Sequence, residues 1–202
     1  MTALVGWEIS GRVYMTGRIV AGLILSLLLI LPSTGQALTP RQGEIWLLID
    51  EATSTLHVYR GEREIERFQP ISVGRRGVSQ TRLRGDMTTP AGEFRINWIN
   101  RDSDFNIFLG LDYPNLDNAR EAKRSGVFSE VEFNRYLDYY RRNGAPPQDT
   151  VLGSNIGIHG LGKSDPAIHE RFNWTEGCVA VTNRQIERLA DLVQLGTTVI
   201  IR

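Results

Sequence analysis

The sequence predicts a mainly β domain that follows an export signal and contains one inserted helical region. Between residues 44 and 111, short segments with alternating apolar and polar residues are separated by turn residues, which is the pattern of half-buried strands. Residues 131–142 change to helical spacing, and residues 184–195 do so again near the C-terminus. A long apolar run occurs only at the N-terminus.

The N-terminal segment has the organisation of a secretory signal peptide. Arg12 and Arg18 precede the apolar run 19–31, and a stretch of small residues ends at Ala37. We therefore expect export to the periplasm or cell envelope, with cleavage after Ala37 and with Met15 as an alternative start. The other interpretation is an uncleaved membrane anchor, but a run of 13 residues is short because a bilayer requires about 20.

The expected mature chain, residues 38–202, has a length that suits one domain with its own core. The first 37 residues hold two of the 23 basic and one of the 23 acidic side chains, which leaves 21 basic and 22 acidic. This balance argues against nucleic-acid binding and against electrostatic attachment to membranes. We expect a monomer.

The first part of the domain is predicted to be a β meander. Pro70 cannot donate to a strand ladder, so it indicates an edge or a bulge. Residues 75–86 are rich in Arg and Gly and are expected to form a loop. The predicted strands are 44–50, 54–60, 64–73, 93–99 and 107–111.

The inserted helix is predicted over residues 131–142. Ser129 and Glu132 have capping-box spacing, and Gly144 provides a C-terminal stop. The apolar face of this helix either packs on the sheet, which is our expectation, or walls a substrate cleft. The residues on that face are Phe133, Tyr136, Leu137 and Tyr140.

The last part of the chain returns to strands around one further helix. Strands are expected at 156–159 and 178–181, followed by a helix over 184–195 that Asn183 caps and Gly196 ends. An apolar strand over 197–201 closes the domain.

Cys178 is the only cysteine of the chain. In an exported protein, a lone cysteine forms an intermolecular disulfide, is a buried inert thiol or acts as a nucleophile. Gly177 directly before it permits unusual φ angles and allows backbone N–H groups to face a reacting oxygen. A nucleophilic thiol also requires a base, and an imidazole is the usual one.

Three histidines are candidates for this base. His57 alternates with apolar residues in a predicted strand and is expected to face solvent, and His169 is expected to be solvated in the polar loop 163–173. His159 ends a predicted strand directly before Gly160. A Cys178–His159 pair on two adjacent strands is therefore the favoured arrangement.

Three stretches in this order resemble the L,D-transpeptidase catalytic domain (YkuD) family: GDMTTPAGEF (85–94), IGIHGLG (156–162) and FNWTEGCVAVTN (172–183). The resemblance implies a β-sandwich-like fold with the catalytic strand in its middle, and peptidoglycan stem peptides as substrates.

The family chemistry implies a role for each residue of the motif. Cys178 would attack the carbonyl of the third stem residue and form a thioester, and His159 would be the general base. The Gly160 carbonyl would orient the imidazole, and the turn at Gly177 would let the Cys178 N–H hold the oxyanion. No cofactor is implied, and one cysteine with scattered histidines is not a metal-ligand set.

Two departures leave the reaction open. Many family members have an arginine where this chain has Ala180, so Arg82 or Arg84 is expected to supply the cation. Trp174 and Thr175, together with Tyr113 upstream, resemble a branch that includes hydrolases acting on stem peptides or releasing a wall-attached lipoprotein. Acyl transfer and hydrolysis therefore both remain as alternative reactions. The expected substrate-binding residues are Trp174, Thr175, Tyr113 and Arg84.

Other classes of protein fit less well. A papain-like peptidase has its cysteine before its histidine in the chain, which is the reverse of the order here. A sortase requires an arginine on a following strand, but Arg184 and Arg188 lie in the predicted last helix. A non-catalytic peptidoglycan-binding domain is the remaining alternative, and the intact His-Gly and Gly-Cys pairs argue against it.

Overall fold

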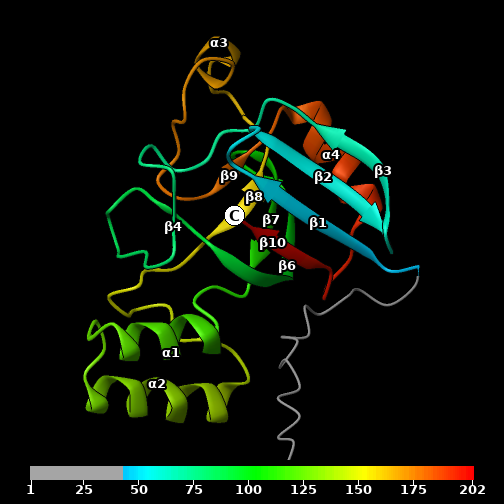
Figure 1. Cartoon of the computed structure of the whole chain (residues 1–202). Helices are drawn as coiled ribbons and strands as arrows, with labels where there is room; N and C mark the ends of the chain where they lie inside the picture. The colour runs from blue at the N-terminus through cyan, green and yellow to red at the C-terminus, as the bar shows by residue number, and fades with distance from the viewer. Residues whose placement is uncertain (1–42) are drawn as a thin grey trace, which may run out of the picture. The chain divides into compact units, whose positions relative to one another are not determined.

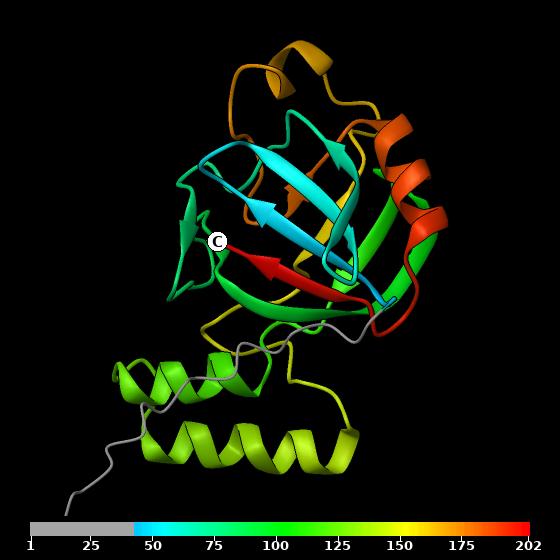
Figure 2. The ribbon, with the colours of Figure 1, turned by 45° about the vertical axis from the view of Figure 1, so that its right-hand side comes forward.

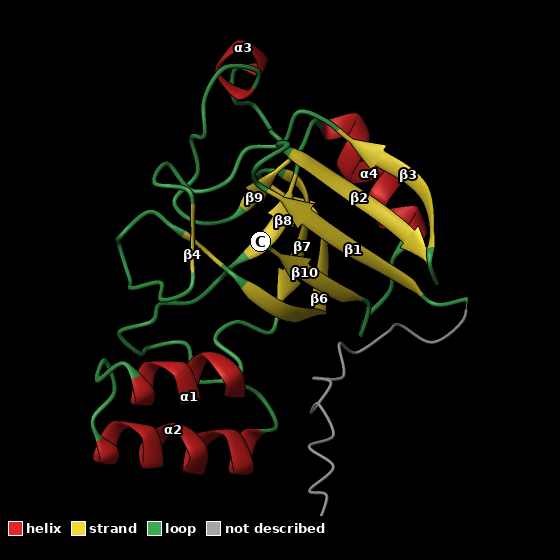
Figure 3. Cartoon of the chain, in the orientation of Figure 1, coloured by secondary structure: helices red, strands yellow, loops and turns green. Residues whose placement is uncertain are grey.

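The structure is a computed structural model that describes residues 43–202, so the expected signal peptide lies outside the described residues. Most of the strands form one eight-stranded sheet (Figures 1 and 3). Its strands are β1 (Ile45–Asp50), β2 (Thr55–Arg60), β3 (Arg63–Phe68), β6 (Gly92–Ser103), β7 (Asn106–Leu111), β8 (Gly157–His159), β9 (Val179–Ala180) and β10 (Thr198–Ile201).

The order of strands in this sheet is β3-β2-β1-β10-β6-β7-β8-β9. The 12-residue strand β6 joins its two halves, since it pairs with β10 near its start and with β7 beyond that point. Two short strands, β4 (Val78–Ser79) and β5 (Thr89–Pro90), form a separate parallel pair. The prediction of a mainly β fold is confirmed.

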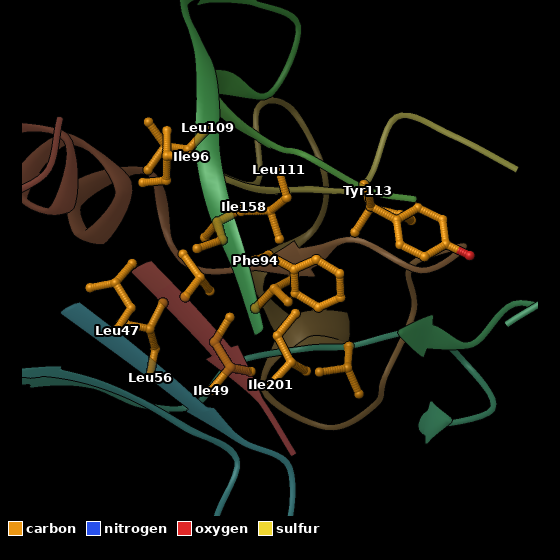
Figure 4. Packing of buried hydrophobic residues seen from close by; sticks show 14 of the residues in the cluster. Leu47, Ile49, Leu56, Phe94, Ile96, Leu109, Leu111, Tyr113, Ile158 and Ile201 are labelled. Atoms are coloured by element: carbon orange, nitrogen blue, oxygen red, sulfur yellow. The ribbon is translucent and has the colours of Figure 1, made fainter. Parts of the chain in front are cut away.

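The two halves of the sheet share one hydrophobic core. Leu47 and Ile49 of β1 lie in the same buried cluster as Leu109 of β7 and Ile158 of β8, and all four are fully buried. Figure 4 shows these side chains converging from both halves, with Phe94 of β6 between them. Side chains on one face of each strand fill the core because successive residues alternate between faces.

Helices α1 (Leu116–Arg124) and α2 (Glu130–Asn143) form the inserted region and lie side by side at one edge of the domain (Figure 2). The Ser129 capping box and the left-handed Gly144, with φ of 65°, confirm the predicted ends of α2. Helix α1 was not predicted because its sequence is polar, with only Ala119 and Ala122 buried.

Helix α4 (Asn183–Leu192) corrects two details of the predicted C-terminal helix. Its N-cap is Thr182, whose hydroxyl accepts from the Gln185 N–H, and it ends at Leu192 instead of residue 195. Asn183 does not cap because its side chain bonds both the N–H and the carbonyl of Gly162.

The predicted strand 64–73 is shorter in the structure. Strand β3 ends at Phe68, the Gln69-Pro70 peptide is cis, and β3 lies at the edge of the sheet, as Pro70 indicated. Beyond it, Ser72 bridges to Ala180 and Gly74 to Thr175. Within residues 43–202, no helix combines the length and apolar character that crossing a membrane requires.

Candidate active site

Strands β8 and β9 place Cys178 and His159 on the same face of the sheet. The strands are parallel neighbours, with Ile158 opposite Val179 and His159 opposite Ala180. Ile158 and Val179 are buried in the core. Because side chains alternate along a strand, His159 and Cys178 point to the other face.

That face forms one wall of a cleft of about 920 Å³. Cys178 and His159 both line this cleft, together with Trp174, Thr175 and Arg84. The other walls come from the loop after β3, the β6–β7 hairpin and the loop that precedes β8.

Tyr113 does not line the cleft, although the sequence predicted that it contacts substrate. Its side chain is 2% exposed, and its hydroxyl donates to the Leu152 carbonyl at 2.8 Å. Its ring packs edge-on against Phe94, at 6.0 Å between ring centroids (Figure 4). Tyr113 therefore supports the loop before β8 and does not reach a bound molecule.

A backbone carbonyl fixes the orientation and the tautomer of the His159 ring. Nδ1 lies 2.6 Å from the Gly160 carbonyl oxygen. A carbonyl only accepts hydrogen bonds, so Nδ1 carries the proton and Nε2 keeps its lone pair. Residue 160 must be glycine, since a Cβ there would lie 2.6 Å from the Phe105 carbonyl and 2.7 Å from Asn183 Oδ1.

Aromatic rings surround the His159 imidazole. Phe105 lies 4.3 Å away between ring centroids, Phe108 lies nearly parallel at 6.0 Å, and Trp174 presents an edge at 6.0 Å. This burial lowers the pKa of His159 from its ordinary value near 6.5, with a smaller opposing effect from the Gly160 carbonyl. The resting imidazole is therefore neutral at neutral pH.

The Cys178 thiol is protonated in the resting site. Its Sγ–H donates to the Asn155 carbonyl at 3.4 Å. Burial raises the pKa of the thiol to about 11, while the Gly157 backbone and the Arg82 charge act in the opposite direction. The cleft thus holds a neutral thiol and a neutral imidazole, and such a thiol becomes a thiolate only when a base removes its proton.

Thr175 organises the turn that carries Cys178. Its hydroxyl donates to the Cys178 carbonyl at 2.6 Å and accepts from the Gly177 N–H at 3.2 Å. Gly177 has φ of 135°, and a Cβ there would lie 2.7 Å from the Thr88 carbonyl. The Gly177 N–H is therefore already bonded within the turn.

The structure corrects the prediction for His169. This residue is 3% exposed at the end of the short helix α3 (Pro166–His169). Its Nδ1 lies 2.9 Å from Ser72 Oγ and its Nε2 lies 3.1 Å from the Pro70 carbonyl. The expectation of a solvated side chain was wrong because α3 folds the loop back onto residues 70–72.

His57 lies on β2, away from the cleft, and is less exposed than expected. Its neighbours Leu56 and Val58 face the core, as predicted. Its own side chain is 16% exposed and lies 3.2 Å from Glu64 on the next strand. Its position leaves His159 as the histidine that lines the cleft.

The arginine that many family members place after the cysteine has no space at Ala180. Ala180 is fully buried, and its N–H and carbonyl both pair with Ser72. The cations of the cleft are Arg75, Arg82 and Arg84 instead. Arg75 and Arg84 are both exposed, whereas Arg82 is buried, and Arg84 donates to the Thr150 carbonyl at 2.9 Å.

Two residues of the site were not found from the sequence. Asn155, whose carbonyl accepts from the thiol, has φ of 55°, and Phe105 packs on the His159 ring from the β6–β7 hairpin. The run Gly153-Ser154-Asn155 is a turn signal that could have identified the left-handed Asn. Among residues 43–202, no three or more His, Cys, Asp or Glu side chains gather as metal ligands.

Comparisons with known proteins extend this description. The structure is similar to that of the helical cell shape determining protein Pgp2 from Campylobacter jejuni, with a TM-score of 0.52 and 20% identity over 79% of this chain and 47% of that chain. It is also similar to Bdellovibrio bacteriovorus Bd1075, with a TM-score of 0.52 and 22% identity over 79% of this chain and 48% of that chain. The chain therefore spans about half the length of these relatives.

No curated protein sequence matches the chain. The model of the L,D-transpeptidase catalytic domain (YkuD) family matches residues 44–201, which is nearly all of the part that the structure describes. The matched residues include Cys178, His159 and the other residues that line the cleft. The chain belongs to the L,D-transpeptidase catalytic domain family.

Proposed function

We propose that this protein is an exported cysteine acyltransferase that acts on peptidoglycan stem peptides. The observation that carries the proposal is the pairing of two residues in one cleft: the Cys178 thiol and the His159 imidazole, whose Nε2 has a free lone pair. Family membership supports stem peptides as the substrate class and the cell envelope as the place of action.

The reaction begins with transfer of the Cys178 proton to Nε2 of His159. The sulfur then attacks the carbonyl carbon of the third stem residue, and the Cys178 N–H donates to the oxyanion that forms. When the C–N bond to the terminal D-alanine breaks, the imidazolium returns the proton to the leaving amine. The product is a thioester on Cys178.

The second half of the reaction determines the product. Attack by the side-chain amine of a neighbouring stem forms a cross-link, whereas attack by water releases a shortened stem. The segment Trp174–Ala180 (WTEGCVA) resembles the branch that contains hydrolases, so hydrolysis of stem peptides or release of a wall-attached lipoprotein is the second candidate. The structural similarity to Pgp2, a helical cell shape determining protein, extends the proposal to cell shape.

The test incubates the purified protein with a disaccharide-tetrapeptide and identifies the products by mass spectrometry. A cross-linked dimer indicates transfer, and a tripeptide with free D-alanine indicates hydrolysis. Cys178→Ser is expected to abolish both while leaving the circular dichroism spectrum unchanged, since a serine hydroxyl beside a lone imidazole is a poor nucleophile. Near-native turnover by this variant would show that the proposed mechanism is wrong.

We further propose that the cleft discriminates only weakly for a free stem carboxylate. Arg84 is solvent-exposed and already donates to two backbone carbonyls, and exposed charge pairs contribute about 1 kcal/mol or less. We expect less than about a tenfold preference for a tetrapeptide over its C-terminal amide, since 1.4 kcal/mol corresponds to a factor of ten.

Arg84→Gln is expected to remove this small preference. Arg76→Gln is the matched control, because Arg76 is exposed in the same region but does not line the cleft. Competition between the two peptides, read by mass spectrometry, measures the ratio. A preference of a hundredfold that persists in Arg84→Gln would contradict the assignment of Arg84.

A further inference from the structure

Arg82 is a buried cation in the wall of the cleft. Arg82 is only 7% exposed, and it lines the same cleft as Cys178. Among the ion pairs formed within residues 43–202, none involves Arg82. A buried charge is costly unless other groups compensate it, so the position of this guanidinium requires an explanation.

Three backbone carbonyls provide the compensation. Arg82 donates from Nε to Thr88 at 2.9 Å, from Nη1 to Leu152 at 2.7 Å and from Nη2 to Glu176 at 3.3 Å. The carbonyls of Leu152 and Glu176 are 70 and 94 residues away in sequence. Arginine can make this arrangement because its planar group carries five N–H donors, whereas lysine has a single nitrogen.

These three carbonyls belong to the segments that frame the nucleophile. Thr88 lies in the G-D-M-T-T-P stretch, Leu152 lies in the loop before β8, and Glu176 lies two residues before Cys178. The guanidinium also lies over the Tyr113 ring at 5.6 Å, and the Tyr113 hydroxyl donates to the same Leu152 carbonyl. Tyr113 therefore supports one side of this contact set.

The guanidinium packs directly against the backbone of the catalytic turn. A Cβ on Gly177 would lie 2.9 Å from Arg82 Nε, and a Cβ on Gly153 would lie 2.6 Å from Nη1. Glycine at both positions lets the turn and the loop before β8 approach Arg82 closely. These close approaches place Arg82 directly against the turn that carries Cys178.

We propose that Arg82 is a positioning residue: it ties the Cys178 turn to the two facing loops and holds a positive charge beside the sulfur that becomes negative during attack. The proposal rests on the proposed role of Cys178 as the nucleophile. The positive charge of Arg82 also opposes the effect of burial, which raises the pKa of the Cys178 thiol.

The experiment measures the rate at which iodoacetamide alkylates Cys178 between pH 6 and pH 10 in the full chain, read by mass spectrometry. Since an adjacent opposite charge changes a pKa by about one unit or more, Arg82→Gln is expected to slow alkylation about tenfold at pH 8. Arg82→Lys keeps the charge and is expected to stay within about threefold of the wild type. Arg76→Gln is the control and is expected to match the wild type.

A second measurement separates positioning from charge. Both Arg82 variants lose the three-carbonyl contact, so both are expected to lower kcat on a stem tetrapeptide at least tenfold with little change in KM. A folded Arg82→Gln protein with the wild-type alkylation profile would overturn the proposal. If Arg82→Gln does not fold, Arg82→Lys decides, because an unchanged kcat in that variant would overturn it.

The alkylation measurement uses no peptidoglycan, so it distinguishes failure of this proposal from failure of the proposed function. A wild-type protein that turns over no stem peptide, yet shows slowed alkylation in Arg82→Gln, would contradict the substrate and retain the role of Arg82.

Discussion

His159 and His169 are each 3% exposed, and burial lowers the pKa of both rings, but their hydrogen bonds differ. The His159 ring bonds a carbonyl through Nδ1 and lines the cleft. The His169 ring bonds Ser72 through Nδ1 and Pro70 through Nε2, and it lies outside the residues that line the cleft.

The difference shows that burial and a lowered pKa do not by themselves identify a catalytic histidine. A general base requires a nitrogen with a free lone pair that faces the reacting proton. In the proposed mechanism His159 supplies this nitrogen, because the Gly160 carbonyl bonds Nδ1 and leaves Nε2 with its lone pair. His169 has both nitrogens occupied, so its ring fastens the α3 loop to residues 70–72.

The sharpest test of the comparison is to remove each ring. His159→Ala is expected to lower kcat on stem peptides by about 10²- to 10⁴-fold, the usual cost of losing a general base. His169→Ala is expected to change kcat by much less, once the folded fraction is taken into account. Steady-state kinetics with product analysis measures both.

His57→Ala is the control for loss of a histidine outside the cleft, and it is expected to turn over at close to the wild-type rate. Equal losses of kcat in all three folded variants would remove the distinction between His159 and the other histidines.

The next effect concerns the stability of the fold, for which His169 is expected to matter more than His159. His169→Ala leaves the partly buried Pro70 carbonyl without its ring donor, a loss that costs about 1–3 kcal/mol, whereas the Ser72 hydroxyl can still donate to the Phe172 carbonyl at 3.1 Å. We expect a clear drop in the urea midpoint for this variant and an unchanged alkylation rate at Cys178. A His169→Ala protein as stable as the wild type would show that the α3 contact does not stabilise the fold.

A smaller effect is expected on the pH dependence of stability. Both buried rings have pKa values below the ordinary 6.5, so the unfolded chain binds protons first as the pH falls. Their contribution is therefore complete above about pH 6.5 and is lost as the pH falls further, by at most about 1.4 kcal/mol per pH unit for each ring.

Urea unfolding between pH 7.5 and pH 5 measures this slope. His169→Gln removes one titrating ring, so its slope below pH 6.5 is expected to be shallower than that of the wild type. Identical slopes would show that His169 does not titrate with folding.

The smallest effect concerns the pH dependence of catalysis. Because the pKa of His159 is lowered, the ring stays neutral and able to accept a proton at pH values below 6.5. The acidic limb of kcat/KM is therefore expected to have its midpoint below 6.5, and His169→Gln is expected to leave that midpoint in place. A midpoint above 6.5 would contradict the burial of the base.

The family resemblance and much of the secondary structure could be predicted from the sequence because they depend on local patterns. Alternating residues predicted most of the strands, and the Ser129 and Gly144 caps predicted the ends of α2 within one residue. The motif also indicated Cys178 and His159, and the assignment of their chemical roles stays a prediction. Helix α1 was missed because most of its residues are polar and its two buried residues are small alanines.

Tertiary structure decided the features that depend on contacts between distant residues. The burial of His169 comes from Ser72, 97 residues away, and the position of Arg82 comes from carbonyls as far as Glu176. Tyr113 lies outside the cleft because its hydroxyl donates a hydrogen bond to the Leu152 carbonyl. No local pattern encodes these partners, because a hydrogen bond between remote segments exists only after the sheet has brought those segments together.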